Sequence, residues 1–212
     1  MVKDTHSSAV IFDFDGTIAD SFLVALGVVY EAAHKNKSLP KEDISRLRAM
    51  SLRQLLQTLR ISWWRAFLIV RRIRRLMHGS MNEVSVVPGM VEAIKALQTK
   101  HKLFILSANS LTNVRGFLQR YEIEACFIDI VGNAYPFGKE RRLVEIIHQN
   151  NLLNDQTWYV GDEAQDIKAA KNAGIKSAAV TWGYSNIHVL ETRQPDVLVF
   201  SPDELISLFN KQ

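Results

Sequence analysis

Short, continuous apolar runs recur along the chain, and helical segments separate most of them. A run without polar alternation is typical of a strand that is buried on both faces of a sheet. Strands that alternate with helices form a parallel sheet with helices on both sides. The sequence therefore predicts an α/β fold with a doubly wound, Rossmann-like parallel sheet. The expected strands are Ala9–Phe12, Leu103–Leu106, Phe127–Val131, Trp158–Val160, Ser177–Thr181 and Val197–Phe200.

One long region interrupts this alternation. From about Ser21 to Val84 every segment has a helical pattern and none resembles a strand. Helices inserted after the first strand of a parallel sheet form a separate cap. We therefore expect an α/β core from residues 1–20 and 85–212, and an α-helical cap from residues 21–84.

Composition limits the class of protein only broadly. With 212 residues, of which 47% are hydrophobic, the chain can bury a core of ordinary size. The net charge of +4 favours anionic partners, but it does not distinguish phosphate metabolites from nucleic acid or lipid headgroups. The single cysteine implies no disulfide. The N-terminus has no secretory pattern, and no segment reaches the roughly 20 apolar residues of a transmembrane helix. We expect a cytoplasmic protein.

Two carboxylates follow the first expected strand, at Asp13 and Asp15. Side chains at positions i and i+2 of a strand point the same way, so both should face one pocket. Gly16 permits a sharp exit and close approach by a ligand. A simple turn is an alternative, since Asp and Gly favour turns. A calcium loop is excluded, because Ile18 and Val24 occupy the positions where an EF-hand needs Gly and Glu.

A second acidic cluster follows the expected strand Trp158–Val160. Asp162 lies at the end of that strand, and Asp166 opens the next helix. Oxygen ligands at strand ends suit Mg²⁺, which binds a few carboxylates together with water and phosphate oxygens. The alternative for Asp166 is that it only caps its helix.

A serine-containing segment, Ser107-Ala108-Asn109-Ser110, follows the strand Leu103–Leu106. Its hydroxyl and backbone N–H groups would suit a phosphate at a helix N-terminus. The alternative is an ordinary N-cap for the helix that begins near Leu111. No nucleophile elbow surrounds Ser107.

Lys139 follows Gly138 in a segment that is not a Walker A loop. The spacing of Gly132 and Gly138 differs from that motif, and Glu140 stands where Ser or Thr is needed. Taken by itself, a lysine such as Lys139 is more often solvent-exposed than phosphate-binding.

Together, the four motifs occur in the order Asp-x-Asp-Gly-Thr, Ser, Lys and Gly-Asp-x-x-x-Asp. This order resembles the haloacid dehalogenase-like hydrolase superfamily over nearly the whole chain. The phosphoglycolate phosphatase-like branch is similar in four segments, which are Ser107–Ser110, Phe137–Lys139, Tyr159–Ile167 and Thr181–Tyr184.

The resemblance implies a catalytic role for each matched residue. Asp13 would attack phosphorus and carry an aspartyl-phosphate, and Asp15 would act as acid and then as base. Ser107 would bind the transferring phosphoryl group, and Lys139 would balance charge. A carboxylate is a recognised nucleophile in phosphoryl transfer, and it needs cations beside it to approach an anionic phosphate.

The resemblance also implies a phosphate site and a Mg²⁺ site. Asp162 would bind Mg²⁺ beside Asp13 and the Asp15 backbone carbonyl, and Asp166 would support the metal site or orient Lys139. The residues expected at the phosphate are Gly16, Thr17, Ser107, Ala108, Asn109 and Lys139. The residues expected at the metal are Asp13, Asp15, Asp162 and Asp166.

The expected cap contains an unusual segment, Trp63–Met77, with an apolar stripe and a cluster of arginines at Arg71, Arg72 and Arg75. Three interpretations remain open. The basic face is solvated, or its arginines bind a carboxylate or second phosphate of the substrate, or it contacts acidic lipids or nucleic acid.

The resulting hypothesis is a Mg²⁺-dependent phosphatase for a small phosphorylated metabolite, such as phosphoglycolate or a sugar phosphate, with no nucleic acid as partner. The alternatives are a phosphomutase of the same superfamily and a non-catalytic protein that binds anions, lipids or nucleic acid through its basic cap helix. The retained Asp13, Asp15, Lys139 and Asp162 favour the enzyme.

Overall fold

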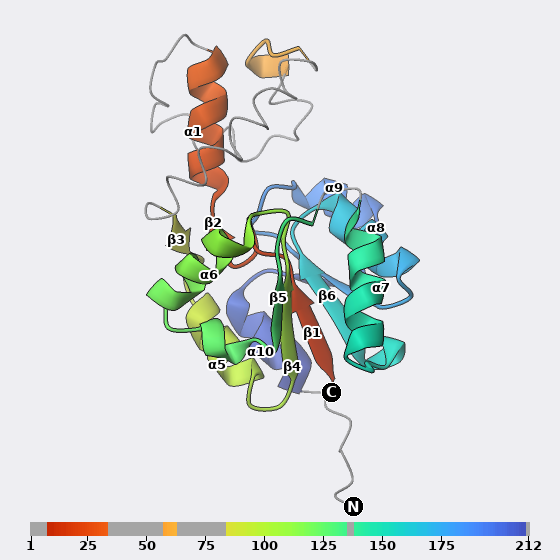
Figure 1. The fold of residues 1–212 in the computed structure, drawn as a ribbon. Coiled ribbons are helices and arrows are strands. Elements are labelled where there is room, and N and C mark those ends of the chain that lie inside the picture. The colour runs from red at the N-terminus through yellow and green to blue at the C-terminus, as the bar shows by residue number, and fades with distance from the viewer. Residues whose placement is uncertain (1–7, 34–56, 63–83, 135–137, 211–212) are drawn as a thin grey trace, which may run out of the picture.

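The computed structural model describes residues 8–33, 57–62, 84–134 and 138–210. Within them, a six-stranded parallel sheet runs in the order β5-β4-β1-β6-β7-β8 (Figure 1). All six expected strands are present, five of them with slightly shifted ends, which confirms the predicted α/β fold. The strands are β1 (Ala9–Phe12), β4 (Lys102–Leu106), β5 (Asp129–Val131), β6 (Thr157–Gly161), β7 (Lys176–Val180) and β8 (Val197–Val199).

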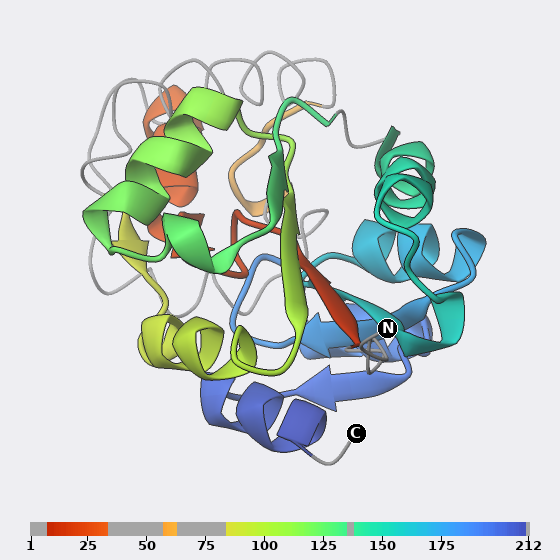
Figure 2. The same ribbon diagram turned by 60° about the horizontal axis from the view of Figure 1, so that its bottom comes forward.

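Helices cover both faces of this sheet (Figure 2). Short 3-10 helices at Glu124–Cys126 and Asn154–Gln156 lie in the connections. One face carries α5 (Met90–Leu97), α6 (Leu111–Arg120) and α10 (Pro202–Asn210). The other carries α7 (Lys139–Gln149), α8 (Ala164–Asn172) and α9 (Ile187–Thr192). None of the helices in the described ranges is long and apolar enough to cross a membrane.

Strand β1 lies in the middle of the sheet and is buried on both faces. Val10 and Phe12 pack into the cluster beneath α5, α6 and α10, whereas Ala9 and Ile11 pack into the cluster beneath α7 and α8. Each fully buried large side chain contributes about 1.5–3 kcal/mol. A strand with two apolar faces has no polar alternation, and for this reason the sequence of β1 is a continuous apolar run.

The direction of winding reverses beside β1. The chain first builds β4 and β5 on one side of this strand, and later builds β6, β7 and β8 on the other. In open α/β sheets, ligands bind outside the carboxyl ends of the strands at such a switch point. The ends of β1 and β6 are therefore the place where a site is expected.

An antiparallel pair, β2 (Ala19–Asp20) and β3 (Ser85–Val86), joins the two chain passages that flank the expected cap. The sequence did not predict this pair, because two residues are too few for a periodic pattern. Helix α1 (Phe22–Ala33) projects beyond the carboxyl ends of the main strands (Figure 1). The segment Trp63–Met77 lies outside the described residues. The division into core and cap therefore stays a prediction.

Candidate active site

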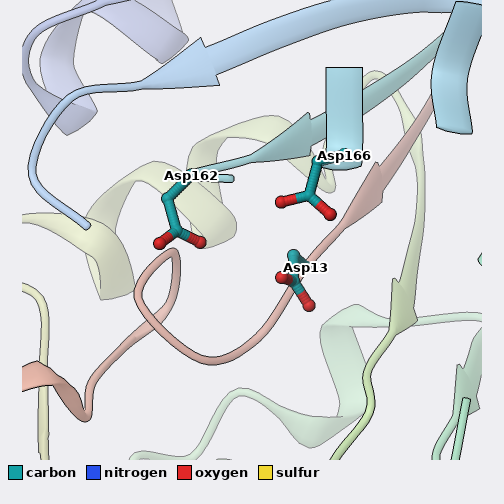
Figure 3. A group of neighbouring side chains, drawn as sticks. All are labelled: Asp13, Asp162 and Asp166. Carbon is teal, nitrogen blue, oxygen red and sulfur yellow. The ribbon is translucent and has the colours of Figure 1, made fainter. Parts of the chain in front are cut away.

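Three buried aspartates gather at the carboxyl ends of β1 and β6 (Figure 3). Asp13 directly follows β1, Asp162 directly follows β6, and Asp166 lies in the first turn of α8. One carboxylate oxygen from each lies within 4.8 Å of the other two. The atoms that these residues could offer to a metal are all oxygens, which Mg²⁺ prefers as ligands in proteins.

Asp13 is held in place by its backbone and by both of its carboxylate oxygens. Its N–H donates to the carbonyl oxygen of Val160 (2.8 Å), which extends the pairing of β1 with β6. Oδ1 accepts from the backbone N–H of Phe14 (2.8 Å), and Oδ2 accepts from Nζ of Lys139 (2.7 Å). The side chain has little freedom to change rotamer.

Lys139 is the first residue of α7, and its ammonium group lies between two carboxylates. Nζ is 2.7 Å from Oδ2 of Asp13 and 2.7 Å from Oδ1 of Asp166. The side chain is 5% exposed, so the alternative of a solvent-exposed lysine is wrong. Burial acts to lower the pKa of Lys139, but the two carboxylates outweigh it and hold the pKa well above its ordinary value. Lys139 is therefore a fixed positive charge.

Asp166 both caps its helix and contacts Lys139. Its Oδ2 accepts from the backbone N–H of Glu163 (2.9 Å), and the Glu163 side chain accepts from the backbone N–H of Asp166. This reciprocal pair is a capping box that begins α8. The remaining oxygen, Oδ1, contacts Lys139. One carboxylate thus fixes the helix and the lysine relative to each other.

Asp162 is fully buried and is held from two sides. Oγ1 of Thr17 donates to Oδ1 (3.0 Å), and the backbone N–H of Tyr184 donates to Oδ2 (2.7 Å). Two glycines make room for it. A Cβ atom on Gly16 would lie 2.3 Å from Oδ2, and a Cβ atom on Gly183 would lie 2.2 Å from Oδ2. No larger residue fits at either position without displacing the carboxylate.

Among the described residues, the ammonium group of Lys139 contacts two of these three carboxylates, so negative charge is in excess. Burial raises the pKa of Asp13 to about 8, although the charge of Lys139 opposes this. Burial, together with the neighbouring Asp13, also raises the pKa of Asp162 well above its ordinary value. An excess of buried negative charge is costly unless a cation compensates it. The site is therefore suited to a divalent cation such as Mg²⁺.

Asp15 lies outside this cluster and contacts the loop after β4 instead. Nδ2 of Asn109 is 3.2 Å from Oδ2 of Asp15 and 3.5 Å from Oδ1. Burial raises the pKa of Asp15, and hydrogen bonds from Ser21 and Asn109 oppose this rise. The carboxyl group is half-buried, so it can reach a ligand at the strand ends.

The loop after β4 begins with Ser107, which is fully buried. Its backbone N–H donates to the carbonyl oxygen of Val131 (2.8 Å), and its Oγ accepts from the backbone N–H of Asn109 (2.9 Å). Ser110, not Ser107, caps α6, since its Oγ accepts from the backbone N–H of Asn113 (3.3 Å). The helix-cap interpretation therefore applies to Ser110 and leaves Ser107 available for another role.

Residues 10–180 match the family model described as haloacid dehalogenase-like hydrolase. The chain belongs to this family. It is 29% identical over 201 residues to phosphoglycolate phosphatase of Synechococcus elongatus, with 93% of this chain and 95% of the relative covered. It is 28% identical over 237 residues to phosphoglycolate phosphatase of Escherichia coli O157:H7, with 97% and 94% covered.

Solved structures agree with this assignment at the level of the fold. A haloacid dehalogenase-like family protein from Streptococcus pneumoniae superposes with a TM-score of 0.75 at 22% identity, and 97% of this chain and 99% of that protein are covered. The predicted superfamily, its phosphoglycolate phosphatase-like branch and the class of phosphoric monoester hydrolase are confirmed.

Of the residues that the sequence predicted for the site, the structure brings together Asp13, Lys139, Asp162 and Asp166. The side chains of Asp15 and Asn109 form a second group. Gly16 adopts a φ of 80°, in the left-handed region that favours glycine. The catalytic, phosphate-binding and metal-binding assignments themselves stay predictions.

Sequence reasoning missed the part of the site that comes from the loop after β7. The backbone N–H of Tyr184 holds Asp162, and Nε1 of Trp182 donates to the carbonyl oxygen of Thr17 (3.1 Å). The sequence marked Thr181–Tyr184 as a family-like segment without a role. A backbone donor leaves no trace in residue type, so its function could not have been predicted from the sequence.

Proposed function

We propose that the chain is a Mg²⁺-dependent phosphatase that hydrolyses a small phosphorylated metabolite through an aspartyl-phosphate on Asp13. The observation that carries this proposal is the ammonium group of Lys139, 2.7 Å from both Asp13 and Asp166, beside a third buried carboxylate. An anionic nucleophile can approach an anionic phosphate only where fixed positive charge lies beside both.

The first step transfers the phosphoryl group to the protein. A carboxylate oxygen of Asp13 forms a bond to phosphorus as the ester P–O bond breaks. Asp15 donates its proton to the departing oxygen, which leaves as an alcohol. In the second step Asp15 takes a proton from water, whose oxygen attacks phosphorus. The bond to Asp13 breaks, and inorganic phosphate is released.

Ser107 and Lys139 bind the phosphoryl group in this proposal. Because Oγ of Ser107 accepts from the N–H of Asn109, its own hydrogen can point to a phosphoryl oxygen. Lys139 adds its charge from the other side. The backbone around Ala108 and the Gly16-Thr17 turn complete the predicted phosphate site. The Thr17 side chain supports this site indirectly, since it donates to Asp162.

Mg²⁺ would be held by Asp13, Asp162 and the backbone carbonyl of Asp15, with Asp166 beside them, and when bound it would supply positive charge to the phosphate. The oxygen-only ligand set and the excess of buried carboxylates support this choice.

The substrate proposed first is phosphoglycolate, because it is the substrate named for the relatives that span nearly the whole chain. Residues 21–84 are proposed to form the cap over the site, and the paired strands β2 and β3 at its base support this division. A cytoplasmic location and the absence of a nucleic-acid partner stay predictions from the sequence.

The test is phosphate release from phosphoglycolate, sugar phosphates and an aryl phosphate with Mg²⁺. The controls are EDTA and the Asp13→Asn variant. We expect release that requires both the metal and Asp13. An isomerised sugar phosphate without free phosphate would identify a phosphomutase instead. If no substrate reacts while the protein binds anionic vesicles or nucleic acid in a salt-sensitive way, the catalytic proposal is wrong.

A further inference from the structure

We propose that Asn113, a buried residue of α6, is a positioning residue that orients Asp15 through the side-chain amide of Asn109. The inference rests on the proposed role of Asp15 as general acid. Asn113 acts on Asp15 through Asn109. Its effect passes through a chain of hydrogen bonds that begins in the helix and ends at the carboxylate.

Two donors converge on the amide oxygen of Asn109. The backbone N–H of Ser110 donates to Oδ1 (2.9 Å), and Nδ2 of Asn113 donates to the same atom (2.9 Å). An amide group has its acceptor and its donor on opposite sides. With Oδ1 held by these two donors, Nδ2 of Asn109 is directed to Asp15, 3.2 Å from Oδ2 and 3.5 Å from Oδ1.

The opposite orientation of this amide is unfavourable at both ends. A flipped Asn109 would place its oxygen against the carboxylate of Asp15, where two acceptors repel. It would also place its NH₂ group against the donors of Ser110 and Asn113. The hydrogen-bond network therefore selects one orientation.

Asn113 is suited to this function because the helix fixes it. Its backbone N–H donates to Oγ of the capping residue Ser110 (3.3 Å), and the residue is 8% exposed. The next buried positions of α6, Val114 and Phe117, pack into the core. The amide donor of Asn113 thus comes from a rigid element, whereas Asn109 and Asp15 lie on connecting segments.

The positioning matters most in the step that protonates the leaving oxygen. General acid catalysis contributes about 10²- to 10⁴-fold, and it requires the acid within hydrogen-bond reach of the leaving oxygen. An alkyl phosphate expels a poor leaving group and depends on that proton. A nitrophenyl phosphate expels a good leaving group and depends on it little. Loss of the network should therefore change the ratio between these two substrates.

The experiment measures kcat/KM of full-length protein with Mg²⁺ on phosphoglycolate, or the alkyl phosphate found most active, and on nitrophenyl phosphate. The parameter kcat/KM reports the steps up to departure of the leaving group. The variants are Asn113→Asp, which keeps the shape and replaces the donor by an acceptor, and Asn113→Ala, which removes the donor. The matched control is Asn150→Asp, since Nδ2 of Asn150 also donates to a carbonyl oxygen, that of Ile146 (3.0 Å), at the far end of α7.

We expect both Asn113 variants to lose roughly 10-fold or more on the alkyl phosphate and less than about 3-fold on nitrophenyl phosphate, within the range of general acid catalysis. The Asn150→Asp variant should leave the ratio unchanged. An equal loss on both substrates, or no loss, in the Asn113 variant that folds overturns the inference. Asn113→Asp keeps the side-chain volume and Asn113→Ala reduces it, so the test can still be made with one variant if the other is unstable.

An Asp15→Asn variant separates this inference from the proposed function. If Asp15→Asn itself does not discriminate between the two substrates, the proposed role of Asp15 fails. If Asp15→Asn discriminates and the Asn113 variants do not, only the role of Asn113 fails.

Discussion

Replacing Gly183 by alanine places one carbon atom against the carboxylate at the centre of the proposed metal site. The new Cβ would lie 2.2 Å from Cβ and 2.2 Å from Oδ2 of Asp162. Ordinary carbon contacts occur at about 3.5–4.0 Å, so the two residues must separate by more than about 1 Å. Gly183 does not have a positive φ, and the strain of this substitution comes from the contact alone.

Asp162 has little room to move in response. It is fully buried, and its two oxygens are held by Oγ1 of Thr17 (3.0 Å) and the backbone N–H of Tyr184 (2.7 Å). A shift of about 1 Å in a catalytic group can cost roughly 10²-fold in rate. Disturbing the neighbours of a metal ligand typically costs about 10- to 100-fold in metal affinity. We expect the Mg²⁺ concentration for half-maximal activity to rise within that range.

The assay is phosphate release against Mg²⁺ concentration, with thermal melting in EDTA to compare the folds. Gly116→Ala is the matched control, because a Cβ atom on Gly116 meets nothing within 4 Å. This helical control should gain about 0.5–1 kcal/mol in stability and keep the wild-type Mg²⁺ dependence. If Gly183→Ala folds normally and its Mg²⁺ dependence equals that of the wild type, the argument that Asp162 holds the metal is refuted.

Three further predictions concern Lys139, the proposed metal site and His101. The Lys139→Met variant should lose roughly 10²- to 10³-fold in kcat at saturating Mg²⁺, because Asp13 loses the ammonium group beside it. A variant that keeps more than about a tenth of the wild-type kcat in steady-state kinetics would contradict this. At about 100 times its dissociation constant, Mg²⁺ should stabilise the protein by about 2.7 kcal/mol and raise the Tm. The Asp162→Asn variant should show a smaller rise in Tm. An equal rise in the variant and the wild type argues against Asp162 as part of the Mg²⁺ site. Burial, together with the charge of Lys100, lowers the pKa of His101 below 6.5. The unfolded chain therefore takes up this proton first, and the free energy of unfolding should fall as pH drops through 6.5. Urea denaturation at about pH 8 and about pH 5 should show a smaller decrease in the free energy of unfolding for His101→Gln than for the wild type. An equal decrease in both proteins would exclude His101 as the cause.

The main sheet and the residues at its edge were accessible from the sequence for a physical reason. The inner strands β1, β4 and β6 are buried on both faces, which produces apolar runs such as Ala9–Phe12. Asp13, Ser107 and Asp162 each directly follow one of these runs. The pairing of β1 with β6 then brings Asp13 to the residues after Val160. The closeness of Asp13 to Asp162 and Asp166 depends on the strand order, which the apolar runs alone do not give. The family resemblance supplied the expectation that these residues share one site.

The remaining features depend on three-dimensional contacts that residue types do not encode. The contacts of Tyr184 and Asn113 are of this kind, since one acts through a backbone N–H and the other through the orientation of a neighbouring amide. Lys139 was ambiguous, because its burial depends on the way that α7 packs beside two carboxylates. The two-residue strands β2 and β3 are too short for any periodic signal.

The position of β1 has a consequence for how the protein folds as it is synthesised. The strand leaves the ribosome before the other strands of its sheet, yet both of its neighbours, β4 and β6, come much later in the chain. Its apolar side chains have no sheet partner until Lys102–Leu106 has been made. Pairings between such distant segments form slowly and leave hydrophobic surface open to aggregation. The nascent chain should therefore depend on chaperones until β4 has been synthesised and should acquire its aspartate cluster only after Asp166.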